Sequence, residues 1–142
     1  MVLYVKDILE KSFLSLSRGT SVLEAAKAMK SAQHGFAVIG SPDSPEGIVT
    51  EWDILSKVVA EGRDPSKVTL AEVMTTELLT VSANEGIAAV AQIMSERGVR
   101  RMLVKDGDRV IGYVTAKTVL ANLKAYVDKI STQISRLQAP WF

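Results

Sequence analysis

Apolar and polar positions follow a pattern along this chain that occurs twice. Between residues 21 and 32 apolar residues recur every three or four positions, and the same spacing returns at 86–97. Spacing of this kind predicts amphipathic helices. Each segment is followed by a short apolar run, at 36–40 and at 101–105, which predicts a buried strand.

The remaining elements repeat in the same order. Each half has a short helix, a brief strand, the longer helix, two paired strands and a second helix. In the first half, we expect these elements at 5–11, 14–16, 21–32, 36–40, 47–50 and 51–61. In the second half, we expect them at 70–75, 79–81, 86–97, 101–105, 110–115 and 116–138. Turn residues in "GSPDSPE" and "KDGD" join the paired strands.

One offset relates the two halves without a gap. Gly47 falls on Gly112, 65 positions later, and the residues "GIVTEWDIL" fall on "GYVTAKTVL". Such self-similarity indicates tandem copies of one structural unit. We therefore expect an α/β (α+β) protein in which two β-α-β-β-α units pack sheet to sheet as a pseudo-two-fold pair, because neither unit buries much surface alone. The expected divisions are a first unit at 1–62, a linker at 63–69, a second unit at 70–125, and a C-terminal helix extension and tail at 126–142.

The ends of the two longer helices carry recognisable signals. Ser21 followed by Glu24 can form a capping box at the start of the first helix. Gly35 and Gly98 follow the two periodic segments. Because glycine commonly ends a helix, we expect these two residues to close them.

Composition narrows the function classes. The 142 residues are 47% hydrophobic, carry a formal net charge of +1, and include no cysteine and one histidine. This excludes disulfides, thiolate chemistry and a multi-histidine metal site within one chain, and gives no global field for nucleic acid or membranes. The N-terminus is too polar for a signal peptide, and no apolar run approaches the roughly 18 residues of a membrane span. We therefore expect a cytoplasmic protein without membrane partners.

The repeated motif differs at one position that carries charge. Asp53 in the first copy is matched by Thr118 in the second. Thr50 and Asp53 can form a capping box, worth about 1 kcal/mol to a helix. They also place a hydroxyl and a carboxylate at the turn from strand to helix, where free amides suit a polar ligand. The sequence leaves both interpretations open.

Two tandem units that each end in Gly-x-x-Thr-x-x-(Asp), with apolar residues after the glycine, resemble cystathionine-β-synthase (CBS) domains. The pair is similar to a Bateman module, and the resemblance covers residues 1 to about 125. The resemblance implies a regulatory sensor that binds AMP, ADP or ATP, or less often S-adenosylmethionine. It also implies that no obligatory cofactor and no catalytic residue are present, and that an unknown enzyme or transporter is regulated.

The resemblance further implies roles for individual residues. Asp53 would accept hydrogen bonds from the ribose hydroxyls, with Thr50 beside it. Positive charge for phosphate would come from the other unit, and the adenine would lie against the start of that unit. The residues expected in these two roles are Arg100, Arg101 and Lys117 for phosphate, and Leu79 and Thr80 for adenine. The second cleft, with Thr118 in place of the carboxylate, is expected to be weak or empty.

The basic residues have a simpler interpretation as well. Arg97, Arg100 and Arg101 can form a solvated basic helix end, which the helix dipole favours. A nucleic-acid surface at 97–105 is disfavoured by the near-neutral charge and by the lack of aromatic residues among the basic ones. An enzyme is the least expected class, because no nucleophile–base pair, metal cluster or phosphate-binding loop is found.

The C-terminal helix carries an apolar seam. Leu123, Val127, Ile130, Ile134 and Leu137 alternate spacings of four and three. This is the spacing of a coiled coil. We expect a homodimer, with "APWF" at the C-terminus as a candidate part of its interface. The alternative is that the seam packs back on its own unit.

Three functions therefore stay open. The first is a sensor that passes nucleotide occupancy to a partner by population shift. The second is a structural or interaction module that binds no nucleotide, with Asp53 as a helix cap. The third is a binder of S-adenosylmethionine or nucleic acid.

Overall fold

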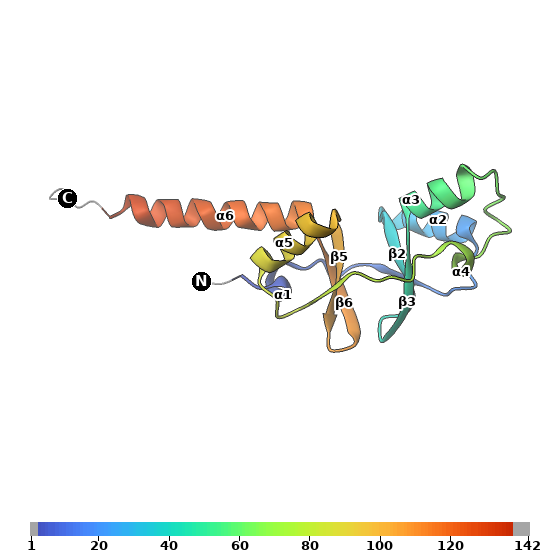
Figure 1. Ribbon diagram of the computed structural model, residues 1–142, viewed down its shortest axis with the longest axis horizontal. Coiled ribbons are helices and arrows are strands. Elements are labelled where there is room, and N and C mark those ends of the chain that lie inside the picture. Colours follow the sequence, from blue (N-terminus) through green and yellow to red (C-terminus); the bar gives the residue numbers. More distant parts are fainter. Residues whose placement is uncertain (1–2, 138–142) are drawn as a thin grey trace.

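The computed structural model describes residues 3–137 and contains two three-stranded sheets that lie side by side at the centre of the molecule (Figure 1). Helices cover the outer face of each sheet, and the last helix projects well beyond the second unit. The expected pair of α+β units with an extended C-terminal helix is confirmed.

The first repeat contains seven short elements. They are α1 (Val5–Ile8), β1 (Leu14–Leu16), α2 (Val22–Ala32), β2 (Phe36–Ser41), β3 (Ser44–Thr50), α3 (Glu51–Ile54) and the π-helical turn η1 (Leu55–Val59). β1 runs parallel to β2, and β2 pairs antiparallel with β3.

The second repeat has the same order and pairing. Its elements are α4 (Leu70–Val73), β4 (Thr80–Ser82), α5 (Ile87–Arg97), β5 (Arg101–Asp106), β6 (Arg109–Thr115) and α6 (Ala116–Ser135). The sheet order is β4-β5-β6, equivalent to β1-β2-β3. α6 ends three residues before the expected 138, and "APWF" lies outside the described residues.

The two leading short helices are exchanged between the repeats. Val5 and Ile8 of α1 are buried in the core of the second repeat. Leu70 and Val73 of α4 are buried in the core of the first. Each core therefore needs residues from both repeats, and the crossing segments tie the two units together.

The central strands are buried on both faces, which explains their continuous apolar runs. In β2, Ala37 and Ile39 pack on the first core, whereas Phe36 and Val38 contact the second sheet. Leu103 supplies the equivalent contact from β5. The sheets thus meet through a small apolar cluster of their own, as two-sided burial requires.

One helix end differs from the expectation. Gly98 ends α5 in the left-handed conformation, with a φ of 65°, as predicted. α2 ends at Gln33, whose φ is 55°, and not at Gly35. The prediction for Gly35 is wrong because Gln33 already takes the left-handed position, where the Gln33 N–H donates to carbonyls of the last turn.

The second helix of the first repeat begins at Glu51 as expected but changes type after one turn. From Leu55 to Val59 its hydrogen bonds are π-helical, and the Ala60 N–H donates to the Leu55 carbonyl at 2.9 Å. The equivalent part of α6 stays α-helical. Among the described residues, no helix is long and apolar enough to cross a membrane.

Candidate functional site

A cleft between the two repeats holds most of the residues singled out by the repeated motif. Its volume is about 280 Å³. The first repeat contributes the β3–α3 turn, and the second contributes the segment after α4 and the start of β5. The lining residues are Ile48, Thr50, Trp52, Asp53, Thr75, Glu77, Leu78, Leu79, Val99, Arg101 and Leu103.

Asp53 is the third residue of α3 and is almost fully buried, with 5% of its surface exposed. Its Oδ2 accepts hydrogen bonds from the Thr50 N–H at 2.9 Å and from the Thr50 hydroxyl at 3.0 Å. The Asp53 N–H donates to Thr50 Oγ1 at 3.2 Å. The expected capping box is therefore confirmed, and it fixes the carboxylate at the wall of the cleft.

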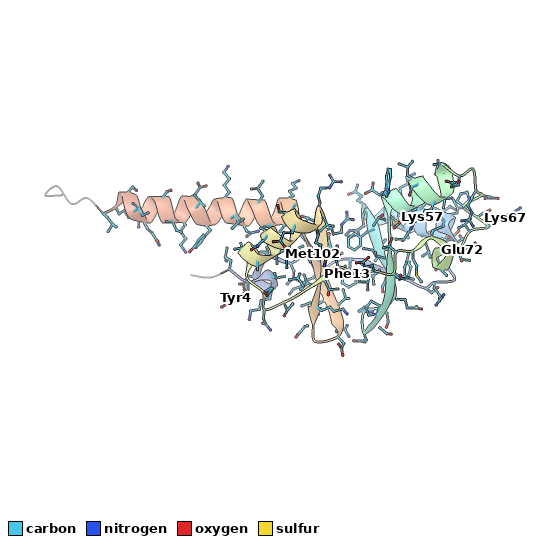
Figure 2. The ribbon with its side chains drawn as sticks, in the orientation of Figure 1. Tyr4, Phe13, Lys57, Lys67, Glu72 and Met102 are labelled. Carbon is cyan, nitrogen blue, oxygen red and sulfur yellow. The ribbon has the colours of Figure 1, made fainter. Side chains whose placement is uncertain are left out.

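The second carboxylate oxygen has two further partners. Asp53 Oδ1 forms an ion pair with Lys57 Nζ at 2.9 Å, and it accepts a hydrogen bond from the Thr75 hydroxyl at 3.2 Å. The Lys57 ammonium also donates to the Val73 carbonyl at 2.9 Å. Figure 2 labels Lys57 beside the first sheet, on the turn that carries it. These contacts balance the charge of a buried carboxylate.

Gly47 explains how Thr75 reaches this carboxylate. The Ile48 N–H donates to the Thr75 carbonyl at 2.9 Å, and the Thr75 N–H donates back to the Ile48 carbonyl at 2.8 Å. A Cβ at Gly47 would lie 2.8 Å from the Thr75 carbonyl oxygen. The glycine of the motif therefore permits the close approach expected from the sequence.

Arg101 enters the cleft from the second repeat. Its guanidinium lies 4.5 Å from the centroid of the Phe36 ring, a cation–π arrangement. Its Nε is buried and has no hydrogen-bond partner within the part of the chain that the structure describes. Burial lowers the pKa of Arg101 below its usual value, and the nearby Glu51 carboxylate opposes this shift only in part. The side chain is thus held in place yet retains a donor without a partner.

The structure brings together four of the seven predicted site residues. Thr50, Asp53, Leu79 and Arg101 line the cleft. The lining does not include Thr80, Arg100 or Lys117, and the side chains of Arg100 and Lys117 are exposed. The part of Arg100 and Lys117 in phosphate binding, and that of Thr80 at the adenine, stay predictions.

Sequence reasoning missed two partners of Asp53. Lys57 lies four residues after Asp53, a spacing that favours ion pairs on helices and could have identified it. Thr75 follows α4, and its approach depends on the exchange of the short helices. No local signal in the sequence indicates that exchange.

The equivalent position in the other repeat is built differently. Thr118 replaces Asp53, and its hydroxyl lies 3.0 Å from that of Thr115. Aromatic rings gather on this side: Phe36 and Tyr113 make an edge-to-face contact at 4.8 Å, and His34 approaches both. Burial raises the pKa of Tyr113, with the Glu10 carboxylate adding to the effect. Within residues 3–137, no group of three His, Asp or Glu side chains could hold a metal ion.

Comparison with known proteins agrees with this architecture. The CBS domain family model matches residues 5–60 and 70–125. The CBS domain-containing protein YhcV of Bacillus subtilis is 28% identical over 118 residues, covering 83% of this chain and 84% of YhcV.

Two solved structures extend the comparison. The CBS domain pair of protein MJ0100, in complex with 5′-methylthioadenosine and S-adenosylmethionine, is 30% identical with a TM-score of 0.76; the match covers 89% of this chain and 99% of that one. The hexameric CBS-CP12 protein from bloom-forming cyanobacteria is 29% identical with a TM-score of 0.75, covering 84% and 71%. CBS pairs are generally regulatory, ligand-binding modules. This chain belongs to the CBS domain family and contains two copies of that domain.

Proposed function

We propose that this CBS pair is a regulatory module that binds an adenosyl ligand in the cleft between its repeats. One observation carries the proposal: the Asp53 carboxylate, buried and held by Thr50, forms the wall of a cleft that Arg101 enters from the other repeat. A carboxylate can accept from both hydroxyls of a ribose, and a guanidinium can donate to an anionic group. The ligands of the MJ0100 pair support the adenosyl class.

Size and charge narrow that class. The cleft volume of about 280 Å³ lies just below the range of small-molecule sites, about 300–1,000 Å³, so a small ligand fits best. The charged residues of its lining are Asp53, Glu77 and Arg101. One cation beside two carboxylates suits a ligand with a single phosphate or an uncharged 5′ group. Among the nucleotides expected from the sequence, AMP therefore fits better than ADP or ATP, and 5′-methylthioadenosine is an equal candidate.

Signalling would follow from where the cleft lies. Both repeats line it, so a bound ligand contacts the two units at once and stabilises the arrangement in which both contacts are made. A ligand shifts such an equilibrium only by its difference in affinity for the two arrangements. The regulated partner would be a separate enzyme or transporter. The chain itself would act in the cytoplasm and would catalyse no reaction.

Self-association would use the projecting helix. Val127 and Ile134 of α6 are 57% and 60% exposed, and Leu137, two residues past the end of the helix, is 78% exposed. Figure 1 shows α6 extending well past α5, so that, among residues 3–137, the distal half of this helix has no neighbouring element of its own unit. The a positions 127 and 134 are β-branched, and the d positions 123, 130 and 137 are Leu, Ile and Leu. With leucine at two of the three d positions, the seam is closer to the pattern of a parallel two-stranded coiled coil than to that of a higher oligomer. We propose a homodimer through this seam.

Tryptophan fluorescence tests the ligand proposal. Trp52 lines the cleft and is 69% exposed, and replacing Trp141 with phenylalanine leaves it as the single tryptophan of the chain. AMP or 5′-methylthioadenosine should change its emission in a saturable way. Asp53→Ala should abolish the change and Thr118→Ala should keep it. An unchanged emission with every adenosyl ligand, together with an unchanged melting temperature, would favour the structural module in which Asp53 is only a cap.

A further inference from the structure

Lys57 engages the carboxylate that the proposed ligand needs. A carboxylate offers about four acceptor positions. Asp53 accepts hydrogen bonds from the Thr50 N–H, the Thr50 hydroxyl and the Thr75 hydroxyl, and the Lys57 ammonium lies 2.9 Å from its Oδ1 as an ion-pair partner. These four groups surround the carboxylate, so a ribose hydroxyl must displace one of them to bind Asp53.

The four donors differ in how easily they can leave. The Thr50 N–H belongs to the helix cap, and the two hydroxyls sit on short side chains of a half-buried segment. Lys57 has a long flexible stem, and its side chain is 44% exposed. An ammonium released into solvent is strongly hydrated. Lys57 is therefore the donor whose departure costs least.

The internal repeat shows that Lys57 and Asp53 occur together. Asn122 occupies the position of Lys57 in the second repeat, where Thr118 replaces Asp53. The Asn122 amide donates to the Thr118 carbonyl at 2.8 Å, a contact made within the helix. The cation is thus present in the repeat that has the carboxylate and absent from the repeat that lacks it.

Lys57 also belongs to a turn that reaches a different surface. It is the middle residue of η1, whose end residues Leu55 and Val59 are 50% and 62% exposed. Both line an outer groove between α2 and η1, together with Ala26, Met29 and Ile54. π-helical turns inside helices are frequent at functional sites. A movement of Lys57 that displaces η1 would therefore change the shape of this groove, because Leu55 and Val59 line it.

We propose that Lys57 is a displaceable counter-ion, which occupies the ribose-binding position of Asp53 in the empty cleft and is released from it when an adenosyl ligand binds. This rests on the proposed function. Lys57 is in this sense a specificity-determining residue, because it makes a ligand hydroxyl compete with a tethered cation. Its release would transmit occupancy of the cleft to η1.

Titration calorimetry with adenosine tests this role, because adenosine has no phosphate for Lys57 to attract. We compare the wild type with Lys57→Met, which keeps the length of the stem, at about pH 8, where a free carboxylate is ionised. Lys57→Met should bind adenosine about twofold to fivefold more tightly, since an ion pair with a half-exposed partner is worth up to about this factor. The gain should vanish with 2′,3′-dideoxyadenosine. Lys57→Arg should restore the wild-type affinity.

The matched control is Lys27→Met, an exposed lysine that pairs with Glu24 away from the cleft. It should leave adenosine affinity unchanged, and circular dichroism should show every variant folded. Weaker adenosine binding by Lys57→Met, or an equal gain for dideoxyadenosine, would overturn the role of Lys57 alone. Failure of both the wild type and Lys57→Met to bind adenosine, AMP or 5′-methylthioadenosine would overturn the proposed function and this inference together.

Discussion

Arg101 and Phe36 occupy the same position in the two repeats, and the guanidinium of one lies 4.5 Å from the ring centroid of the other. Equivalent residues that meet in this way lie close to the pseudo-two-fold axis. Arg101 lines the cleft of Asp53, whereas Phe36 joins the aromatic cluster with His34 and Tyr113. The pair thus marks where the two clefts differ in chemistry.

Arg101→Met should separate ligands by charge. The change removes the donors to an anionic group while keeping an apolar stem on Phe36. We expect AMP to bind at least about tenfold more weakly, because hydrogen bonds to charged groups contribute about 1.5–3 kcal/mol. Adenosine should lose less than about threefold on the same scale. Calorimetry with both ligands measures the difference. Equal losses for AMP and adenosine would show that Arg101 does not face the phosphate. The matched control is Arg18→Met, an exposed arginine that pairs with Glu46 and does not line the cleft.

Gly47→Ala should destabilise the fold. The new Cβ would lie 2.8 Å from the Thr75 carbonyl oxygen, and this backbone cannot move without breaking the contact between β3 and the segment after α4. We expect a loss of about 1–3 kcal/mol in the free energy of unfolding, measured with urea. Gly19→Ala is the control, because a Cβ there meets nothing within 4 Å. A loss of the same size at Gly19 would contradict the close-approach account.

The proposal that α6 dimerises through its seam can be tested by introducing an aspartate on the seam or, as a control, on the opposite side of the helix. Val127→Asp places a carboxylate on the seam, and Ala125→Asp places the same group on the opposite side of the same exposed helix. If α6 dimerises, light scattering should give a dimer for the wild type and Ala125→Asp, and a monomer for Val127→Asp. A dimer that persists in Val127→Asp would place the interface elsewhere.

The cap of α4 predicts a pH dependence of stability. The Thr69 N–H and hydroxyl donate to the Glu72 carboxylate, and Arg63 lies 2.9 Å from it; these contacts lower the pKa of Glu72 from its ordinary 4.5. A lowered pKa in the folded state gives a stabilisation that is present above the ordinary value. It is lost as the pH falls through the lowered value.

Glu72→Gln should therefore unfold at lower urea concentration than the wild type near pH 7, and the two should converge as the pH falls from the ordinary 4.5 through the lowered pKa of Glu72. Urea midpoints across this range measure the effect. Glu61→Gln, an exposed change in the turn after η1, should show no such convergence. A gap between wild type and Glu72→Gln that stays constant with pH would refute the assignment.

Much of the fold could be predicted from the sequence because the repeat supplies the same information twice. The apolar runs at 36–40 and 101–105 identify the central strands, and Gly98 identifies a helix end. The exchange of α1 and α4 could not be predicted, because either repeat offers these helices an equivalent apolar surface. The end of α2 at Gln33 could not be predicted either, because glutamine is not a residue that favours the left-handed conformation.

The candidate site was predictable in part for a similar reason. Thr50 and Asp53 belong to a local motif, and Arg101 follows from its place before an apolar strand. Thr75 reaches Asp53 only through the crossover of the short helices. Arg100 and Lys117 are linked to Arg101 by the family resemblance and by no local pattern; of the three, only Arg101 lines the cleft, and the role of the other two stays a prediction.

The central claim is that Asp53 does more than cap a helix. The most direct measurement is calorimetric titration of AMP, ADP, ATP, S-adenosylmethionine and 5′-methylthioadenosine into the wild type, Asp53→Ala and Thr118→Ala. We predict one site per chain for at least one of these ligands, with AMP or 5′-methylthioadenosine tightest. That site should be lost in Asp53→Ala and kept in Thr118→Ala, which removes only the equivalent contact in the other repeat. No binding of any of the five to the folded wild type would contradict the claim and leave Asp53 as the cap of α3.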